Sequence, residues 1–378
     1  MKVLIVSGIW PPDVGGPASH APEVADFLSS RGHTVEVVTT ATQQPVRRPY
    51  PVRWAARSIP VGLRHVIGGR LVAARARKAD VVYTTGMFGR SALGSRLAGR
   101  PYVLKLTADP AHERAHRRGL SSRTLDEFQH ESPGLAVRLL RAARDAELRG
   151  AAYVMCPSAY LRELVLGWGV EPSRVEVMPN PRPRLPDLPE RAEARRRLGL
   201  AGATLAFAGR LTAQKSLDVA LEAVARNGDV SLVLAGDGVE RDALERRAAE
   251  LDLNGRVRFL GPQPREGVLE LLRAADALLL SSSWENFPHT VVESLAVGTP
   301  VLATAAGGVV EVVDDGRNGL LVPPGDADAL AQAIRRFFGD PALRESLQEA
   351  AAPSVAGYAP DRIYARLEQV LVRSSLPA

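Results

Sequence analysis

The stretch MPNPRPRLPDLP, residues 178–189, divides the chain. Five prolines fall within the eleven positions from Pro179 to Pro189. Proline lacks an amide hydrogen and fixes φ, so neither a helix interior nor a central strand accepts such a run. The stretch therefore predicts a linker, and a chain of 378 residues is long enough for a domain on each side of it.

Short apolar runs alternate with helical periodicity before the linker. Six runs read as buried strands: Val3–Ser7, Thr34–Thr39, Asp80–Thr85, Pro101–Leu106, Ala151–Cys156 and Arg174–Met178. Segments such as Pro17–Ser30 and Leu135–Arg149 between them have the spacing of amphipathic helices. Strand followed by helix followed by strand predicts a parallel sheet with helices on both faces.

The same alternation restarts after the linker. The expected strands are Thr204–Ala208, Ser231–Ala235, Val257–Leu260, Ala277–Ser281, Pro300–Ala303 and Gly319–Val322. Helices are expected to begin near Lys215, Val239, Arg265, Pro288 and Asp326. The fold class predicted is α/β, with two Rossmann-like, doubly wound parallel sheets facing each other across a cleft.

Four segments follow from this pattern. Residues 1–180 are expected to form the first domain, residues 181–196 a Pro-rich linker and residues 197–358 the second domain. Residues 359–378 contain a last helical stretch, which comes after the second sheet is complete. We expect that helix to pack back on the first domain.

Composition and charge narrow the class of protein. With 46% hydrophobic and 24% charged residues, the chain is expected to be globular and soluble. Residues 1–180 hold 25 Lys and Arg against 15 Asp and Glu, a net +10, which leaves −4 for the rest of the total +6. Arg47 to Arg118 is the most basic region, and it suits either a solvated surface or an anionic membrane or acceptor. Few aromatics are interleaved with these cations, so nucleic acid is not expected as a partner.

Nothing in the sequence predicts export or a membrane span. The apolar run after Met1 and Lys2 is too short for a signal peptide, and the longest uncharged stretch, 295–310, is interrupted by Gly and Pro. Cys156 lies in an apolar run and is expected to be a buried, inert thiol. The expected location is the cytoplasm, with peripheral contact with the inner face of the cell membrane as a further option.

Two glycine-containing loops follow predicted strands and precede helices. The first loop ends with Gly15 and Gly16. Glycine lets the backbone approach a ligand closely, and the first amides of the helix that follows favour anions. The second contains Gly209 and Arg210, with Lys215 at the next helix start. An arginine and a lysine five positions apart across such a loop can both reach a diphosphate.

A third loop carries two carboxylates. It reads WENFPHTVVE, with Glu285 in the loop and Glu293 in the helix expected from Pro288. Carboxylates at these positions can accept hydrogen bonds from two sets of hydroxyl groups, as a sugar and a ribose provide.

Together, Gly15-Gly16, Gly209-Arg210 with Lys215, and the two glutamates within ENFPHTVVESLAVGTPV resemble the signature of the retaining family 4 glycosyltransferases of GT-B fold. The resemblance covers essentially the whole chain and includes Pro179–Pro181. It implies a UDP- or GDP-linked sugar donor held mainly by the second domain. The acceptor, a glycan, a lipid-linked molecule or a small molecule, would be held mainly by the first.

The resemblance also implies roles for individual residues. Arg210 and Lys215 would stabilise the donor diphosphate, with a contribution from the Gly16 amide, and no metal or other cofactor would be needed. Glu285 would orient the transferred sugar and Glu293 would hold the ribose. The backbone around Glu285 and the loop that recognises the base supply the other expected donor-binding residues: Arg258, Leu260, Asn286, Phe287, Pro288, His289 and Thr290.

The reacting centre of the first domain is less clearly marked. Many relatives have a histidine just past the strand that corresponds to Pro101–Leu106, where this chain reads KLTADPAH. Either Asp109 or His112 can fill that place, and Asp109 is preferred as the catalytic residue because it is closer to the strand end. The alternative is that Asp109 only caps a turn before Pro110.

Other functions remain as alternatives. His112 to His116 satisfies the zinc motif HExxH, although neighbouring arginines such as Arg117 and Arg118 disfavour a cation. A non-hydrolysing nucleotide-sugar epimerase would share the fold. A dinucleotide-dependent oxidoreductase is disfavoured because the glycines after the first strand lack the GxGxxG spacing.

Overall fold

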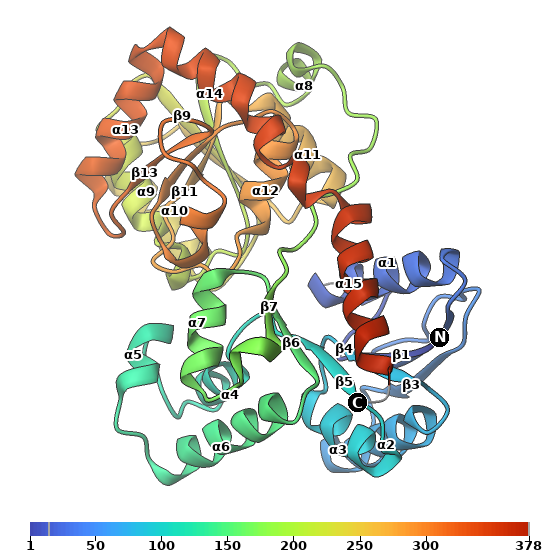
Figure 1. Cartoon of the computed structure of the whole chain (residues 1–378). Coiled ribbons are helices and arrows are strands. Elements are labelled where there is room, and N and C mark those ends of the chain that lie inside the picture. The colour runs from blue at the N-terminus through green and yellow to red at the C-terminus, as the bar shows by residue number, and fades with distance from the viewer. Residues whose placement is uncertain (14–15, 377–378) are drawn as a thin grey trace. The chain divides into compact units, whose positions relative to one another are not determined.

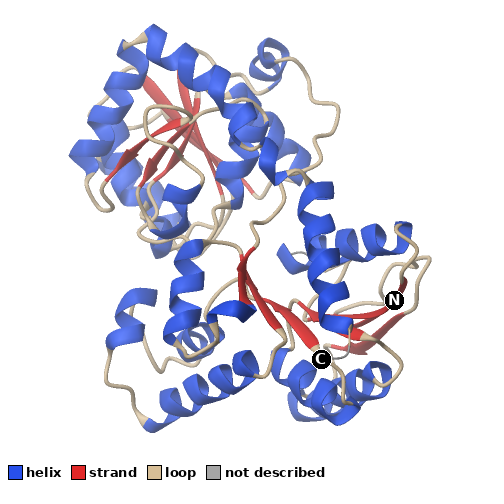
Figure 2. Ribbon diagram, in the orientation of Figure 1, coloured by secondary structure: helices blue, strands red, loops and turns tan. Residues whose placement is uncertain are grey.

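The computed structural model describes residues 1–13 and 16–376. The chain divides into two compact units, Met1–Pro179 with Asp361–Ala378 (unit 1), and Asn180–Pro360 (unit 2). In each unit the strands form one layer flanked by helices (Figure 2). The predicted α/β class with two parallel, Rossmann-like sheets is confirmed.

Unit 1 contains a seven-stranded parallel sheet in the order β3-β2-β1-β4-β5-β6-β7. Its strands are β1 (Lys2–Ser7), β2 (Thr34–Ala41), β3 (Val52–Ala56), β4 (Val81–Thr84), β5 (Tyr102–Lys105), β6 (Tyr153–Cys156) and β7 (Val175–Val177). Its helices are α1 (Gly16–Ser30), α2 (Val61–Ala76), α3 (Phe88–Ala98), α4 (Pro110–Arg117), α5 (Leu125–His130), α6 (Leu135–Arg149), α7 (Ala159–Gly167) and α15 (Pro360–Ser375), with the short 3₁₀ helix η1 (Pro172–Arg174).

Both faces of this sheet are buried, because successive side chains of a strand point to opposite faces. Val3 and Ile5 of β1 belong to one core cluster, and Leu4 and Val6 belong to the other. Cys156 is fully buried as predicted, and burial raises its pKa to about 12. A thiol with that pKa stays protonated at neutral pH and is unreactive.

The last helix covers one face of the unit 1 sheet. Its buried residues follow the three-and-four spacing of an amphipathic helix: Ile363, Tyr364, Leu367, Val370 and Leu371. They join the cluster built on Val3 and Ile5. Figure 1 shows α15 alongside α1, where the Tyr364 hydroxyl donates a 2.6 Å hydrogen bond to Glu23. The prediction that this helix packs on the first domain is confirmed.

Unit 2 contains a six-stranded parallel sheet in the order β10-β9-β8-β11-β12-β13. Its strands are β8 (Ala203–Ala208), β9 (Val230–Ala235), β10 (Val257–Gly261), β11 (Ala277–Leu280), β12 (Val301–Thr304) and β13 (Gly319–Val322). Its helices are α8 (Arg191–Arg197), α9 (Leu217–Ala225), α10 (Arg241–Glu250), α11 (Arg265–Ala274), α12 (His289–Ala296), α13 (Ala327–Gly339) and α14 (Pro341–Ser354). The 3₁₀ helices are η2 (Ala213–Lys215), η3 (Gly307–Glu311) and η4 (Ala356–Tyr358).

The structure differs from the sequence-based expectations at three places. Strand β3 was not expected, because VRWAA at the sheet edge is only partly buried and lacks a continuous apolar run. Residues 191–196, expected in the linker, belong to α8, which lies within unit 2 and buries Ala194. Helices α9 and α10 begin two residues later than expected, at Leu217 and Arg241.

No helix among the described residues is long and apolar enough to cross a membrane.

Candidate functional site

Two loops of unit 2 meet where the strand order reverses. Strand β8 lies between β9 and β11, so the loops after β8 and β11 leave the sheet in different directions at its carboxyl edge. Residues 209–216 form the first loop and residues 281–288 form the second. In parallel sheets of this kind, ligands bind at such a reversal point.

Lys215 and Glu285 face each other across these two loops. The Lys215 ammonium forms an ion pair with Glu285 Oε1, and the two side chains are 16% and 8% exposed. Lys215 ends η2, and Ser216 follows with φ 43°, a left-handed conformation that turns the chain into α9. The sharp turn separates Lys215 from the helix and lets its side chain reach the neighbouring loop.

The Glu285 backbone is held by the loop after β12. Gly308 donates its amide hydrogen to the Glu285 carbonyl over 2.8 Å. Gly307 has φ +54°, and a Cβ atom there would lie 2.1 Å from the same carbonyl oxygen. Only glycine fits this close approach, so the Gly307-Gly308 pair fixes the position of Glu285.

Arg210 lies on the same loop as Lys215 but, unlike it, has no partner among the residues that the structure describes. Its side chain is exposed, and among the described residues it makes no hydrogen bond or ion pair. The loop under it is rigid, because Gly209 and Leu211 donate amide hydrogens to Ala235 and Asp237 over 2.9 Å each. Arg210 therefore offers an uncompensated guanidinium group on a fixed backbone.

Glu293 is the second carboxylate of this edge. It lies in α12, is 17% exposed and approaches the Arg265 guanidinium at 3.4 Å. Burial raises the pKa of Glu293, and the charge of Arg265 partly opposes that rise. The carboxylate is therefore desolvated, and Arg265 is the cation that offsets its charge.

The residues between the two glutamates serve different purposes. Asn286, Phe287 and Pro288 are buried, and the Phe287 ring packs edge-on against Tyr358 with centroids 6.1 Å apart. His289 is exposed, and its Nε2 lies 3.0 Å from Asn180 Nδ2. The Thr290 hydroxyl donates to the Ala208 carbonyl at 3.0 Å, which ties the start of α12 to the end of β8.

Two residues expected at the base-recognition loop have other surroundings. Arg258 is the second residue of β10, and its guanidinium donates to the Leu198 carbonyl at the end of α8 over 2.7 Å. Leu260 is half-buried and packs against the apolar core. Arg258 is thus engaged in a structural contact away from the strand end, because its position in β10 is near the amino end rather than the carboxyl end.

Asp109 of unit 1 is a buried structural residue. Its side chain is completely buried and forms an ion pair with Arg144 at 2.8 Å. It also accepts hydrogen bonds from the Ala111 amide at 2.8 Å and from Gln129 at 3.2 Å. The structure therefore gives no support to the catalytic role expected for Asp109 and agrees with the alternative, a cap at the start of α4.

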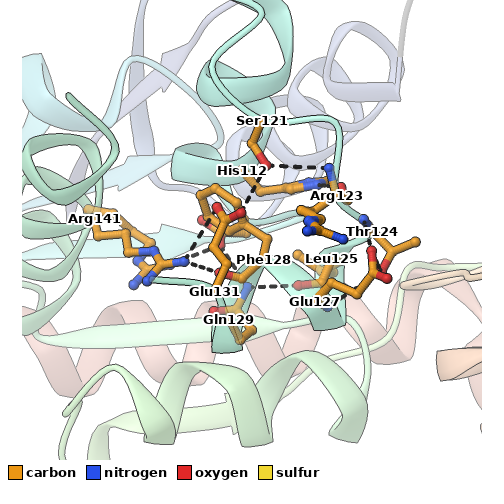
Figure 3. A network of polar contacts seen from close by, with 12 residues as sticks. His112, Ser121, Arg123, Thr124, Leu125, Glu127, Phe128, Gln129, Glu131 and Arg141 are labelled. Atoms are coloured by element: carbon orange, nitrogen blue, oxygen red, sulfur yellow. Dashed lines mark hydrogen bonds and ion pairs between the residues drawn. The ribbon is translucent and has the colours of Figure 1, made fainter. Parts of the chain in front are cut away.

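His112 is part of a polar network around α5 (Figure 3). Its Nε2 lies 2.9 Å from the Arg123 carbonyl, and its ring packs edge-on against Phe128. The His112 and His116 rings share one face of α4, with centroids 6.2 Å apart. Among residues 1–13 and 16–376, no group of three or more His, Cys, Asp or Glu side chains could hold a metal ion.

The glycine pair expected after the first strand is only partly visible. Gly15 lies outside the described residues, and Gly16 is the first residue of α1.

Sequence reasoning missed several residues that build this edge of unit 2. Gln214, Ser281 and Ser283 connect the two loops, Ser282 bonds Glu285 within its own loop, and Arg265 pairs with Glu293. The consecutive serines after an apolar run were a readable signal. The partner of Arg265 was not, because the residues are on different helices.

Comparisons with known proteins agree along the chain. Residues 190–353 match the family described as glycosyl transferases group 1, and residues 15–181 match the glycosyl transferase 4-like domain. The D-inositol 3-phosphate glycosyltransferase of Acidothermus cellulolyticus is 30% identical over 375 residues, covering 89% of this chain and 80% of that protein. The lipopolysaccharide core biosynthesis glycosyltransferase LpsE of Rhizobium meliloti is 41% identical over 149 residues, 39% of this chain. That alignment spans 43% of LpsE, less than half its length.

Solved structures show a similar fold. The crystal structure of Anabaena Alr3699/HepE in complex with UDP-glucose superimposes with a TM-score of 0.79 at 22% identity, covering 99% of this chain and 100% of that one.

Proposed function

Because the chain belongs to the group 1, family 4-like glycosyltransferases of GT-B fold, and is therefore an enzyme, we propose that it uses a nucleotide-sugar donor. In this proposal it transfers a hexose from a UDP- or GDP-linked donor, with retention of configuration. The observation that carries this proposal is the pairing of Lys215 with Glu285 at the carboxyl edge of the unit 2 sheet. Arg210, on the same loop as Lys215, has no partner among the described residues.

Arg210 and Lys215 bind the donor diphosphate in this proposal. The leaving nucleoside diphosphate gains negative charge as the bond to the sugar breaks. Fixed cations that stabilise this charge lower the barrier, because they need no reorganisation when the charge develops. Two protein cations would supply the charge that a metal ion provides in other transferases, so we propose a metal-independent reaction.

The carboxylates orient the two polar ends of the donor. Glu285 would accept hydrogen bonds from hydroxyls of the transferred sugar, and Glu293 from the ribose. We propose that the acceptor hydroxyl attacks from the side of the leaving phosphate, which takes its proton. The bond to the diphosphate breaks, a bond to the acceptor oxygen forms, and configuration is retained.

The acceptor is proposed to be a glycan or a lipid-linked molecule held mainly by unit 1. Helix α2 exposes Val61, Leu63 and Val66 within the basic region from Arg47 to Arg118. Apolar side chains among cations suit the surface of an anionic bilayer, so we also propose peripheral membrane contact. Flotation with vesicles of neutral lipid and of 30% anionic lipid tests it, and binding independent of anionic lipid would contradict it.

A donor panel tests the central proposal. UDP- and GDP-linked glucose, galactose, mannose and N-acetylglucosamine are compared by thermal shift, since a ligand at 100 times its Kd stabilises the folded state by about 2.7 kcal/mol. One donor is expected to raise the Tm, with and without EDTA. Transfer should require an acceptor, whereas an epimerase would convert the donor alone. A panel in which no nucleotide sugar binds would refute the proposal.

A further inference from the structure

Three consecutive serines follow β11 and lead to Glu285, and each makes a different contact. The Ser281 hydroxyl donates to the Lys215 carbonyl at 2.8 Å, and the Ser282 hydroxyl donates to Glu285 Oε1 at 2.7 Å. The Ser283 hydroxyl and amide both donate to the Gln214 carbonyl, at 3.1 and 2.9 Å. The serine run therefore joins the loop that carries Lys215 to the loop that carries Glu285.

Ser282 is the serine that contacts a charged group. Glu285 Oε1 accepts both the Ser282 hydroxyl and the Lys215 ammonium. Among the described residues, the other carboxylate oxygen, Oε2, has no hydrogen-bond partner. Oε2 also does not belong to the fully buried polar atoms that lack a hydrogen-bond partner. One oxygen is thus saturated by the protein, and the other remains available to a ligand.

The Ser282 hydroxyl is itself held in place. Ser282 is completely buried, and its carbonyl accepts a 2.6 Å hydrogen bond from the Thr304 hydroxyl of β12. The Glu285 carbonyl accepts the Gly308 amide at 2.8 Å. Contacts on both sides of the loop therefore fix the donor hydroxyl and the backbone that carries the carboxylate.

We propose that Ser282 is a positioning residue that locks Glu285 through Oε1, so that Oε2 is presented to hydroxyl groups of the transferred sugar. The inference rests on the proposed function, because it assumes that Glu285 binds the sugar. Lys215 alone is a point charge on a flexible chain and does not fix the orientation of a carboxylate. A short, directional hydrogen bond from a buried hydroxyl does.

The first experiment compares Ser282→Ala with Ser283→Ala, a matched control on the exposed neighbour that contacts only backbone. Binding of UDP, UDP-glucose, GDP and GDP-mannose is measured by calorimetry. A hydrogen bond to a charged group predicts that Ser282→Ala weakens nucleotide-sugar binding and lowers kcat/KM about 10- to 100-fold. Binding of the nucleoside diphosphate alone should stay within about twofold. Ser283→Ala should change neither, because the Ser283 amide still donates to the Gln214 carbonyl at 2.9 Å. Ser282→Thr, which keeps a hydroxyl, should retain the preference for the sugar-bearing ligand.

Two outcomes of that experiment would overturn the role of Ser282. Equal loss of UDP and UDP-glucose binding in Ser282→Ala would mean that the hydroxyl only maintains the loop. Unchanged binding of both would mean that it has no part in donor recognition. If the wild-type protein binds none of the four nucleotides, the proposed function fails, and the second experiment decides on Ser282 independently.

The second experiment needs no nucleotide. Unfolding free energies of Ser282→Ala, Glu285→Gln and the double variant form a cycle, and the same cycle is measured with Ser283→Ala. Contact between Ser282 and Glu285 predicts that the first cycle is non-additive and the second additive. Additivity in both cycles would contradict the proposed lock.

Discussion

The Lys215 ammonium and the Glu285 carboxylate are in direct contact although 70 positions separate them along the chain. Both lie on loops that leave the carboxyl edge of the unit 2 sheet, and both are mostly buried. Arg210, five positions before Lys215, is exposed and has no partner among the described residues. The two cations therefore differ: removing Lys215 leaves a buried carboxylate uncompensated, whereas removing Arg210 leaves every internal contact intact.

Arg210→Ala is expected to separate catalysis from stability. The loss of one preorganised charge should lower kcat by about 10²- to 10³-fold. The unfolding free energy should change by less than about 0.5 kcal/mol, as for other exposed residues. Steady-state kinetics with the best donor of the panel and urea unfolding measure the two effects. Arg246→Ala, at an exposed arginine of α10, is the control and should alter neither. Wild-type activity in Arg210→Ala would exclude a role in diphosphate binding.

The raised pKa of Glu293 predicts that the affinity for the nucleotide depends on pH. Burial raises its pKa, so the carboxylate protonates at a higher pH than an exposed glutamate. A protonated carboxyl is a poorer acceptor for two ribose hydroxyls, and affinity for UDP or GDP should fall as the pH drops through the raised pKa. Calorimetry at pH 7.5, 6.0 and 5.0 measures this fall.

Glu293→Gln serves as the control for that titration, because the terminal phosphate of the nucleotide titrates with a pKa near 6 in both proteins. The variant should bind more weakly at pH 7.5 and lose less affinity on acidification. Its stability should not decrease at neutral pH, because a raised pKa means that the folded state favours the protonated form of Glu293. Parallel pH profiles for the two proteins would argue against contact between Glu293 and the nucleotide.

The sequence predicted the sheets well because their strands are buried on both faces and read as unbroken apolar runs. Strand β3, VRWAA, was missed since an edge strand needs no such run. The loops with Lys215 and Glu285 were also found, because glycine, charge and strand ends mark them in the sequence. Side-chain contacts were not predicted: Ser282 lies only three positions before Glu285, but nothing in the sequence shows that its hydroxyl donates to that carboxylate.

Asp109 shows that a residue just past a strand can be held by partners that the sequence does not mark. Its partner Arg144 is 35 positions away, in α6, and stacks over Trp168 at 3.8 Å. Nothing in the order of residues marks that pairing.

Asp109→Ala is therefore expected to act on folding. Removing one partner of a buried ion pair typically costs about 3–5 kcal/mol. Arg144 keeps a second partner, Asp145, at 2.9 Å, so the loss is expected at the lower end of that range. Urea unfolding measures the loss for Asp109→Ala, for Arg144→Met and for the double variant. The double variant should be more stable than the sum of the single losses predicts. A large fall in kcat with unchanged stability would restore the catalytic assignment.

The burial of Lys105 predicts that the free energy of unfolding of unit 1 increases as the pH rises above neutral. The Lys105 side chain, at the end of β5, is fully buried and donates to the Met178 carbonyl. Burial lowers the pKa of Lys105 from 10.5 to about 7. The unfolded chain therefore binds this proton more tightly than the folded protein. The stability contribution is fully present above pH 10.5 and is lost as the pH falls towards 7, with a slope of at most about 1.4 kcal/mol per pH unit.

Lys105→Met isolates this contribution when its urea unfolding is compared with that of the wild type at pH 7.0, 8.0 and 9.0. The neighbouring Cys156 has a raised pKa and contributes the opposite slope above about pH 9, but it does so in both proteins, so the difference between them reports on Lys105. The free energy of unfolding should rise with pH more steeply in the wild type than in the variant. Lys78→Met, at an exposed lysine, should retain the wild-type slope. Equal slopes in wild type and Lys105→Met would mean that the Lys105 ammonium stays charged throughout, held by the Met178 carbonyl despite its burial.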